Sequence, residues 1–256
     1  MQNLKRGSVQ IANPFNPRQI RSTDLRPEAV HAIVFWTRYP QPLLKYLPDL
    51  IRAGYQFVFQ FTLTGYPKIF EPGMPPLEKS ISLFKKLADM IGPSKVIWRY
   101  DPIVISDITD ENFHTENFGK LADSLHSHTG RIVVSHLDFY RKLAPRFNRL
   151  AKQNGIKIID VLQNPKRALR LLTKIKQIAD DCRLLIQTCA EDKFLAKSGI
   201  PPGACIDGPL LSELTGRKII YKKDKHQRPN CRCTESVDIG SYDSCRFGCI
   251  YCYAIR

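Results

Sequence analysis

Three cysteines near the end of the chain have the spacing of ligands to one metal centre. Cys245, Cys249 and Cys252 are separated by three and two residues, and Tyr251 directly precedes the last of them. Thiolates this close in an irregular, glycine-containing loop can converge on one soft metal centre and leave a coordination position for a non-protein ligand. Two alternatives stay open: a zinc site with a fourth protein ligand, and thiols without a shared role.

A second set of cysteines precedes this loop, and it consists of Cys189, Cys205, Cys231 and Cys233. The sulfurs of Cys231 and Cys233 lie on one side if the backbone between them is extended. We expect either an iron–sulfur cluster ligated by protein alone or a zinc site on these four thiols, with buried or free thiols as the alternative. His226 is a substitute ligand or an exposed histidine, and Cys182 is expected to be a packing or surface thiol.

The bulk composition is that of a globular protein. The chain has 256 residues, of which 43% are hydrophobic and 25% charged. No N-terminal apolar run resembles a signal peptide, and no stretch approaches the roughly 20 apolar residues that span a bilayer. We therefore expect a cytoplasmic protein without a membrane partner, in which clustered thiols are metal ligands more often than disulfides.

Strands that alternate with helices are expected to position these groups. Apolar, β-branched and aromatic runs predict strands over residues 31–37, 57–63, 96–100, 131–137 and 184–187. Amphipathic patterns predict helices over residues 42–53, 77–91, 111–126, 140–153 and 165–179. This order indicates an α/β fold, namely a complete or partial (β/α) TIM-like barrel.

The two ends of the chain are expected to differ from this barrel. The Asn-Pro-Phe-Asn-Pro stretch at residues 13–17 should interrupt regular structure. Residues 1–189 would form the barrel, and residues 190–256 an irregular cysteine-rich cap packed on it as one structural unit. One short strand is expected in the cap, near residues 236–239.

Polar side chains follow the predicted strands, where barrel enzymes carry their chemistry. Arg99 could hold the carboxylate of a bound cofactor in a bidentate contact, and Asp101 could meet a ribose hydroxyl or orient Arg99. The alternative is an internal salt bridge that shapes the loop. Arg99 and Asp101 are both candidate catalytic residues. The other residues at strand ends are Thr37, Arg38, Thr62, Thr64, Ser135, His136, Gln187 and Glu191. Of these, Thr62, Thr64 and Ser135 are candidates for cofactor binding, as is Tyr251.

The cysteine loop resembles the signature of radical S-adenosylmethionine enzymes. In those enzymes three cysteines bind a 4Fe-4S cluster, and the fourth iron is open to the amino and carboxylate groups of the cofactor. The resemblance implies reductive cleavage of S-adenosylmethionine and hydrogen abstraction from a substrate. It also implies a low-potential electron donor.

Further stretches resemble the uncharacterised family catalogued as domain of unknown function 1848. They are residues 35–40 (FWTRYP), 60–64 (QFTLT), 98–102 (WRYDP) and 236–242 (SVDIGSY). That family is similar to the spore photoproduct lyase branch of radical enzymes, in which the cysteine loop precedes the Arg-x-Asp-Pro strand end. The reversed order here implies a circularly permuted barrel. Relative to that family, a shortened barrel is also expected.

A basic surface suggests an alternative function. The formal net charge is +15, and residues 131–183 contain thirteen Lys and Arg against four Asp. Lys166, Arg170 and Lys174 recur every four residues and so share one helical face. This face is either simply solvated or a nucleic-acid surface of a non-enzymatic iron–sulfur or zinc protein. The substrate of an enzyme could likewise be a small molecule or a nucleic acid.

Overall fold

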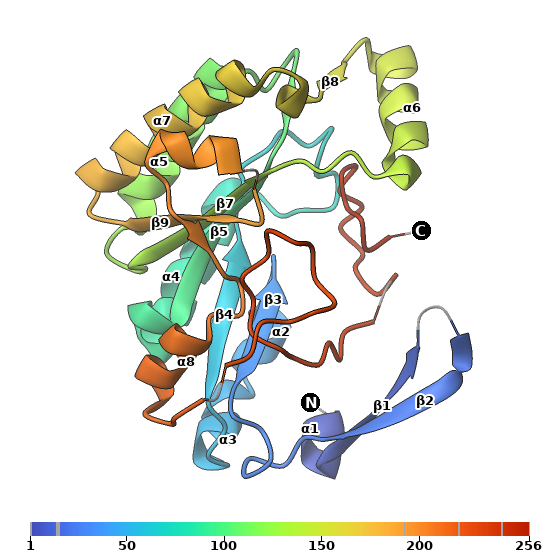
Figure 1. Cartoon of the computed structure of the whole chain (residues 1–256), viewed down its shortest axis with the longest axis vertical. Helices are drawn as coiled ribbons and strands as arrows, with labels where there is room; N and C mark the ends of the chain where they lie inside the picture. Colours follow the sequence, from blue (N-terminus) through green and yellow to red (C-terminus); the bar gives the residue numbers. More distant parts are fainter. Residues whose placement is uncertain (1, 14–15, 192, 220, 242, 256) are drawn as a thin grey trace.

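A parallel sheet of six strands forms the centre of the protein. The computed structural model describes residues 2–13, 16–191, 193–219, 221–241 and 243–255. The strands are β3 (Ile33–Thr37), β4 (Phe57–Thr62), β5 (Val96–Ile103), β7 (Arg131–His136), β9 (Leu185–Cys189) and β10 (Pro202–Gly203), in the order β10-β9-β7-β5-β4-β3. The predicted parallel α/β arrangement is confirmed (Figure 1). In the described residues β3 and β10 are edges, so the pairing does not close into a ring.

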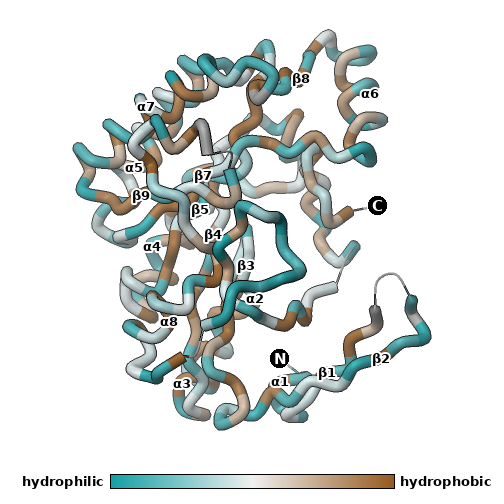
Figure 2. The backbone as a smooth tube through the Cα atoms, viewed as in Figure 1, coloured by the Kyte–Doolittle hydropathy of each residue, from teal (hydrophilic) through white to brown (hydrophobic). Residues whose placement is uncertain are grey.

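Side-chain alternation gives this sheet two different faces. Phe59, Trp98 and Val134 belong to the main core, which the helices complete. Their neighbours in sequence, such as Ile97 and Val133, point to the opposite face and pack against the C-terminal segment. Both faces are therefore buried, which is why the strands are hydrophobic along much of their length (Figure 2).

The predicted helices form, with two adjustments. Helices α4 (Leu77–Ile91), α5 (Glu111–Leu125) and α7 (Pro165–Asp181) pack on the outer face of the sheet. The helix expected over residues 42–53 is split into α2 (Gln41–Leu44) and α3 (Leu47–Arg52), because Pro48 lacks the amide that would continue the first helix. The helix expected over residues 140–153 begins as a 3-10 turn, η2 (Arg141–Leu143), before α6 (Ala144–Asn154).

The N-terminal segment forms a hairpin that the sequence did not predict. After α1 (Gln2–Arg6), β1 (Ser8–Asn13) and β2 (Asn16–Asp24) form an antiparallel hairpin that lies away from the main sheet (Figure 1). Asn13 pairs with Asn16, so the predicted interruption falls where one strand of the hairpin ends and the other begins. Residues 14 and 15 lie outside the described part of the chain.

Residues 190–256 are only partly irregular. They include η4 (Lys193–Ser198), the edge strand β10 and an unexpected helix, α8 (Gly208–Thr215). The side chain of Asp207 accepts a hydrogen bond from the Leu210 amide and so caps α8. The strand expected near residues 236–239 is absent: Val237 and Ile239 are exposed, so no burial favours an extended pairing there.

Four shorter elements complete the described fold. Strand β6 (Ile105–Ser106) pairs with β8 (Ile158–Ile159). The 3-10 turns η1 (Pro93–Lys95) and η3 (Val161–Gln163) precede β5 and α7. Among the described residues, no helix combines the length and hydrophobicity needed to cross a bilayer.

Candidate functional site

Four cysteines gather on the face of the sheet opposite helices α4, α5 and α7, which we call the inner face. We call these residues the inner thiol cluster: Cys189, Cys205, Cys231 and Cys233. The sulfurs of Cys189, at the end of β9, and Cys205 are 3.0 Å apart. Cys205 also exchanges a side-chain hydrogen bond with Cys233, and Cys233 with Cys231. The predicted convergence of these thiols is therefore what the fold produces.

Arg99 connects the sheet to the inner thiol cluster. It stands on β5 with its side chain on the inner face, and it is 7% exposed. Its Nη1 donates to the Cys205 sulfur at 2.7 Å, and its Nη2 donates to Asp101. The internal salt bridge considered for Arg99 is present, and its role in cofactor binding stays a prediction.

The charge of this site is concentrated on Cys205. Hydrogen bonds from Cys189 and then Cys233, together with the charge of Arg99, hold the pKa of Cys205 well below its usual value. The pKa of Cys189 is raised, first because it donates to Cys205 and then because it is buried. Burial would lower the pKa of Arg99, but the charges of Asp101 and Cys205 outweigh it and raise that pKa. Among the four thiols, Cys205 is thus the one whose deprotonated form the surrounding donors favour.

The ends of β5, β7 and β9 contribute polar groups beside this cluster. Ser135 donates a hydrogen bond to Asp101, whose other oxygen binds Arg99. The backbone amide of His136 donates to Glu191 at 2.5 Å. The His136 ring is buried, and neither of its nitrogens has a hydrogen-bond partner within the described part of the chain.

The C-terminal cysteine loop docks on the loop that joins β4 to α4. The Gly73 amide donates to the carbonyl of Phe247 at 2.9 Å, and the Ile250 amide donates to the carbonyl of Phe70 at 3.0 Å. A Cβ on Gly73 would lie 2.8 Å from the Cα and the carbonyl oxygen of Phe247, so only glycine allows this approach. On its other side, the loop is held by Arg146 of α6, which donates to the carbonyl of Cys252 at 2.8 Å.

Glu71 organises a buried polar group beneath the loop, which we call the Glu71 cluster: Arg38, Thr64, Glu71 and Tyr251. One carboxylate oxygen of Glu71 accepts from all three partners, including Thr64 at 2.6 Å. Arg38 also donates to the Tyr251 hydroxyl at 2.5 Å and to Thr64 at 2.7 Å. Burial would lower the pKa of Arg38, but Tyr251 and Glu71 outweigh it and raise it.

Tyr251 therefore anchors the cysteine loop to the sheet. Its ring is buried beside Tyr66, and burial raises the pKa of its hydroxyl well above the ordinary value. Because Tyr251 lies between Cys249 and Cys252 in sequence, its two charged partners fix the position of the loop. Thr64, predicted to bind a cofactor, serves the same anchor.

The three loop thiols differ in exposure. Cys249 is buried, Cys252 is half-buried and Cys245 is exposed. Burial raises the pKa of Cys249 to about 11, and the charges of Glu71, Cys252 and Cys245 contribute to the rise. The three sulfurs are thus electrostatic neighbours. In the observed rotamers, no group of three or more His, Cys, Asp or Glu side chains in the described part of the chain is arranged to hold a metal ion. Both predicted metal sites stay predictions.

Sequence reasoning missed two residues of these clusters. Glu71 lies in a loop rich in proline and glycine, where no periodicity or motif marks it. Gln60, in the middle of β4, donates to the Cys205 carbonyl at 2.8 Å. A polar residue inside an otherwise apolar strand was the available signal. Thr62, a predicted cofactor residue, lies beside Arg99 in the sheet register.

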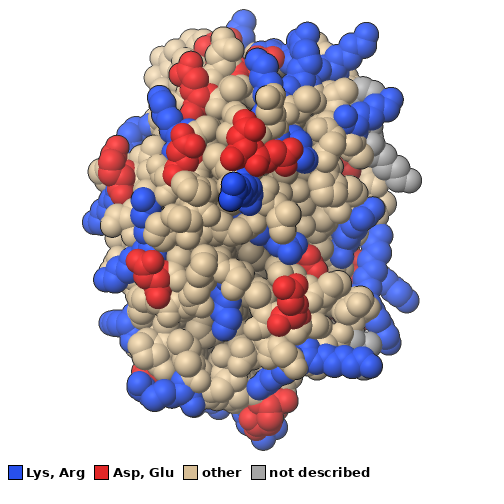
Figure 3. Space-filling view, turned by 90° about the vertical axis from the view of Figure 1, so that its left-hand side faces the viewer, with Lys and Arg blue, Asp and Glu red and all other residues tan. Residues whose placement is uncertain are grey.

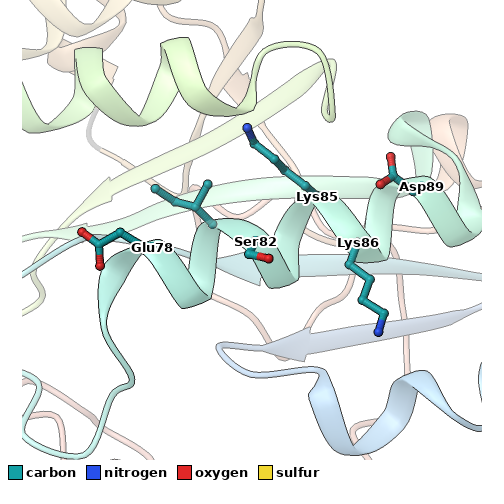
Figure 4. A pocket seen from close by; sticks show the side chains of 6 residues that line it. Glu78, Ser82, Lys85, Lys86 and Asp89 are labelled. Carbon is teal, nitrogen blue, oxygen red and sulfur yellow. The ribbon is translucent and has the colours of Figure 1, made fainter.

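Two surface hollows lie outside these clusters. One, of about 440 Å³, is bordered by residues of α4 alone, including Glu78, Lys85 and Asp89, whose side chains point away from one another (Figure 4). The other, of about 410 Å³, is lined by Arg146 and Arg149 of α6 and by Cys249 of the loop. Only the second borders a candidate site.

The predicted basic face is exposed. Lys166, Arg170 and Lys174 are all exposed on α7. On the side of the molecule drawn in Figure 3, however, acidic side chains are interspersed among the basic ones. Arg167, on the same helix, pairs with Glu111.

The fold defines an α/β protein with a six-stranded parallel sheet, a set of contacting cysteines on one face of that sheet and a C-terminal loop with three further cysteines. The sequence profile of the family described as Domain of unknown function (DUF1848) matches residues 1–254, and the chain belongs to this family. No curated protein matches it.

The solved structure of D-psicose 3-epimerase with D-tagatose from Clostridium cellulolyticum H10 is similar to this chain. The identity is 11% and the TM-score 0.39, over 71% of this chain and 59% of that chain. The chain thus spans less than two thirds of the epimerase's length. A similarity of this size carries no argument about fold or activity.

Proposed function

We propose that this protein is a radical S-adenosylmethionine enzyme whose Cys245, Cys249 and Cys252 hold a 4Fe-4S cluster. The loop itself carries the proposal: three thiols, and not four, occupy a short segment that the backbones of Phe70 and Gly73 hold in place. Such a cluster supplies one electron to S-adenosylmethionine bound at its open iron. A low-potential electron donor is then required as a partner.

The chain's own residues would position and shield this site. The Glu71 cluster fixes the loop through Tyr251, and Arg146 holds the carbonyl of Cys252. A cluster of four irons binds each thiolate at a different iron, so its ligands stand farther apart than those of a single ion. The three loop sulfurs lie near enough to influence one another's charge, and they do not surround a single point. This arrangement is compatible with the wider spacing of cluster ligands.

The permuted barrel is part of the same proposal. The cysteine loop is the last segment of the chain, yet it docks on the loop after β4 and near the end of β3. Residues 190–256 would then act as the cap that excludes water from a reactive site. The substrate, a small molecule or a nucleic acid, would enter at the strand ends.

Anaerobic reconstitution tests the proposal. We expect about four irons and four sulfides in the loop site, an EPR signal that changes on addition of S-adenosylmethionine, and formation of 5′-deoxyadenosine. Cys245→Ser should abolish all three without disturbing packing, because Cys245 is exposed. Cys182→Ser, remote from both thiol sets, is the matched control. An EPR signal that does not change with S-adenosylmethionine, together with no formation of 5′-deoxyadenosine, would refute the proposed enzyme activity.

A second candidate is a non-enzymatic iron–sulfur or zinc protein that binds nucleic acid. The exposure of three basic residues on one face of α7 supports it. Reversal to glutamate of Lys166, Arg170 and Lys174 should weaken binding to a duplex oligonucleotide and reduce the salt slope by about 0.9 for each lost phosphate contact. The matched control reverses the exposed Lys79, Lys86 and Lys120. Equal affinity of wild type and the α7 variant would remove this role.

A further inference from the structure

We propose that the inner thiol cluster binds its own thiophilic metal centre, either a zinc ion or an iron–sulfur cluster, independently of the C-terminal loop. All four protein ligands would be cysteines: Cys189, Cys205, Cys231 and Cys233. The site would be closed, with no position left for a substrate, and its role would be to attach residues 190–256 to the sheet.

The position of the four thiols supports this assignment. They come from three separate stretches of chain, yet they form an unbroken series of side-chain contacts. Cys205, Cys231 and Cys233 are buried with Ile97 and Val133 of the sheet. Burial penalises the charge of a thiolate, and a bound metal ion would offset that penalty for all four sulfurs.

The hydrogen bonds around the sulfurs favour the thiolate form. Arg99 donates to the Cys205 sulfur at 2.7 Å. The amide of Ile206 donates to the sulfur of Cys233, and the amide of Cys233 to the sulfur of Cys231, both at 3.5 Å. These donors stabilise negative charge on sulfur, and such outer contacts accompany metal-bound thiolates.

The sulfurs of Cys189 and Cys205 lie closer together than two ligands of one zinc ion would. Among the described residues no three such side chains surround one point, so the remaining thiols would also have to turn toward the metal. With Zn–S bonds of about 2.3 Å, tetrahedral ligand sulfurs stand about 3.8 Å apart. The 3.0 Å between the sulfurs of Cys189 and Cys205 would therefore widen by about 0.8 Å, within reach of side-chain rotation. The same thiols accommodate a cluster by separating further.

The stability of the C-terminal segment gives a physical reason for such a site. The stretch at residues 222–230 is hydrophilic (Figure 2), and it buries little apolar surface. Yet Gln60 and Gln187 bind the carbonyls of Cys205 and Ala204, so the neighbouring backbone lies firmly against the sheet. A metal centre would link Cys231 and Cys233 to the backbone at Cys205, which is held against the sheet.

Metal analysis of variants without the C-terminal site tests the proposal. The triple variant Cys245→Ser/Cys249→Ser/Cys252→Ser removes the loop thiols and leaves five cysteines. We expect it, purified anaerobically, to retain either about one zinc per chain without sulfide or iron with an equal amount of sulfide. Adding Cys205→Ser should reduce the metal to background, whereas adding Cys182→Ser should leave it unchanged.

The outcomes separate this site from the proposed radical chemistry. Retention of zinc identifies a single ion, and retention of iron with sulfide identifies a cluster. A folded triple variant without metal, or a disulfide between Cys189 and Cys205 found by mass spectrometry, overturns the inference. Should the triple variant not fold, Cys205→Ser in the otherwise native chain is compared with wild type, and an unchanged metal content overturns the inference equally.

Discussion

Gly73 offers the sharpest test of how the cysteine loop is held. In Gly73→Ala the new Cβ would meet the Cα and carbonyl oxygen of Phe247 at 2.8 Å. Reaching an ordinary contact of 3.4 Å requires the two backbones to separate by about 0.6 Å. Because both partners are backbone, no side-chain rotation relieves the clash. Such overpacking costs about 1–3 kcal/mol.

Two hydrogen bonds depend on this approach. The amides of Gly73 and Ile250 donate across the interface at 2.9 and 3.0 Å. Losing either hydrogen bond would cost about 1 kcal/mol, which is comparable to the cost of the overpacking itself. For a chain of this length, each kcal/mol lowers the melting temperature by roughly 2–4 °C.

The assay combines thermal unfolding with amide exchange. Gly130→Ala is the matched control, because its Cβ meets nothing within 4 Å and its backbone does not need glycine. Both variants gain the same entropic benefit from replacing glycine, so the difference between them isolates the clash. We expect Gly73→Ala to melt below Gly130→Ala and to exchange the Ile250 amide faster. Equal melting temperatures with unchanged exchange would show that the loop does not dock in this way.

Further predictions concern buried polar groups. Tyr251→Phe should lower the free energy of unfolding by about 2–3 kcal/mol, because the tyrosine hydroxyl makes two charge-assisted hydrogen bonds. Tyr221→Phe, at an exposed position, should leave the free energy of unfolding unchanged. Similar denaturant midpoints for the two variants would contradict this prediction. Arg99→Met should cost about 3 kcal/mol by leaving the Asp101 charge uncompensated, and adding Asp101→Asn should recover part of the loss; a double variant no more stable than the single one would argue against that origin. His114, whose pKa burial lowers to about 4, binds a proton more readily when unfolded, so stability should fall as the pH decreases from about 6.5 to 4, by roughly 3 kcal/mol from this group. In His114→Gln the pH dependence of urea unfolding should be shallower by that amount, and an identical slope would refute the assignment.

Local patterns were sufficient to predict five of the six strands of the sheet and the long helices α4, α5 and α7. Burial on both faces imposes β-branched and aromatic residues on strands such as Phe57–Thr62, and one-sided burial imposes a helical period on Leu77–Ile91. Both signals are contained in a few neighbouring residues. The helix α8 was missed because a short helix carries few periodic positions. The hairpin was missed because β2 is exposed along most of its length and so lacks the apolar alternation of a buried strand.

In the candidate sites, some residues could be identified from the sequence, whereas the contacts between them could not. Cysteine spacing and strand order identified by themselves the thiols, Arg99 and Asp101, because those residues follow local rules. Only the tertiary structure decided that Arg99 binds Cys205, 106 residues away, and that Tyr251 binds Glu71 across 180 residues. Contacts between such distant segments depend on how the whole sheet twists and which loops meet over it. The sequence thus determined which residues can do chemistry, and the packing of the chain decided which of them meet.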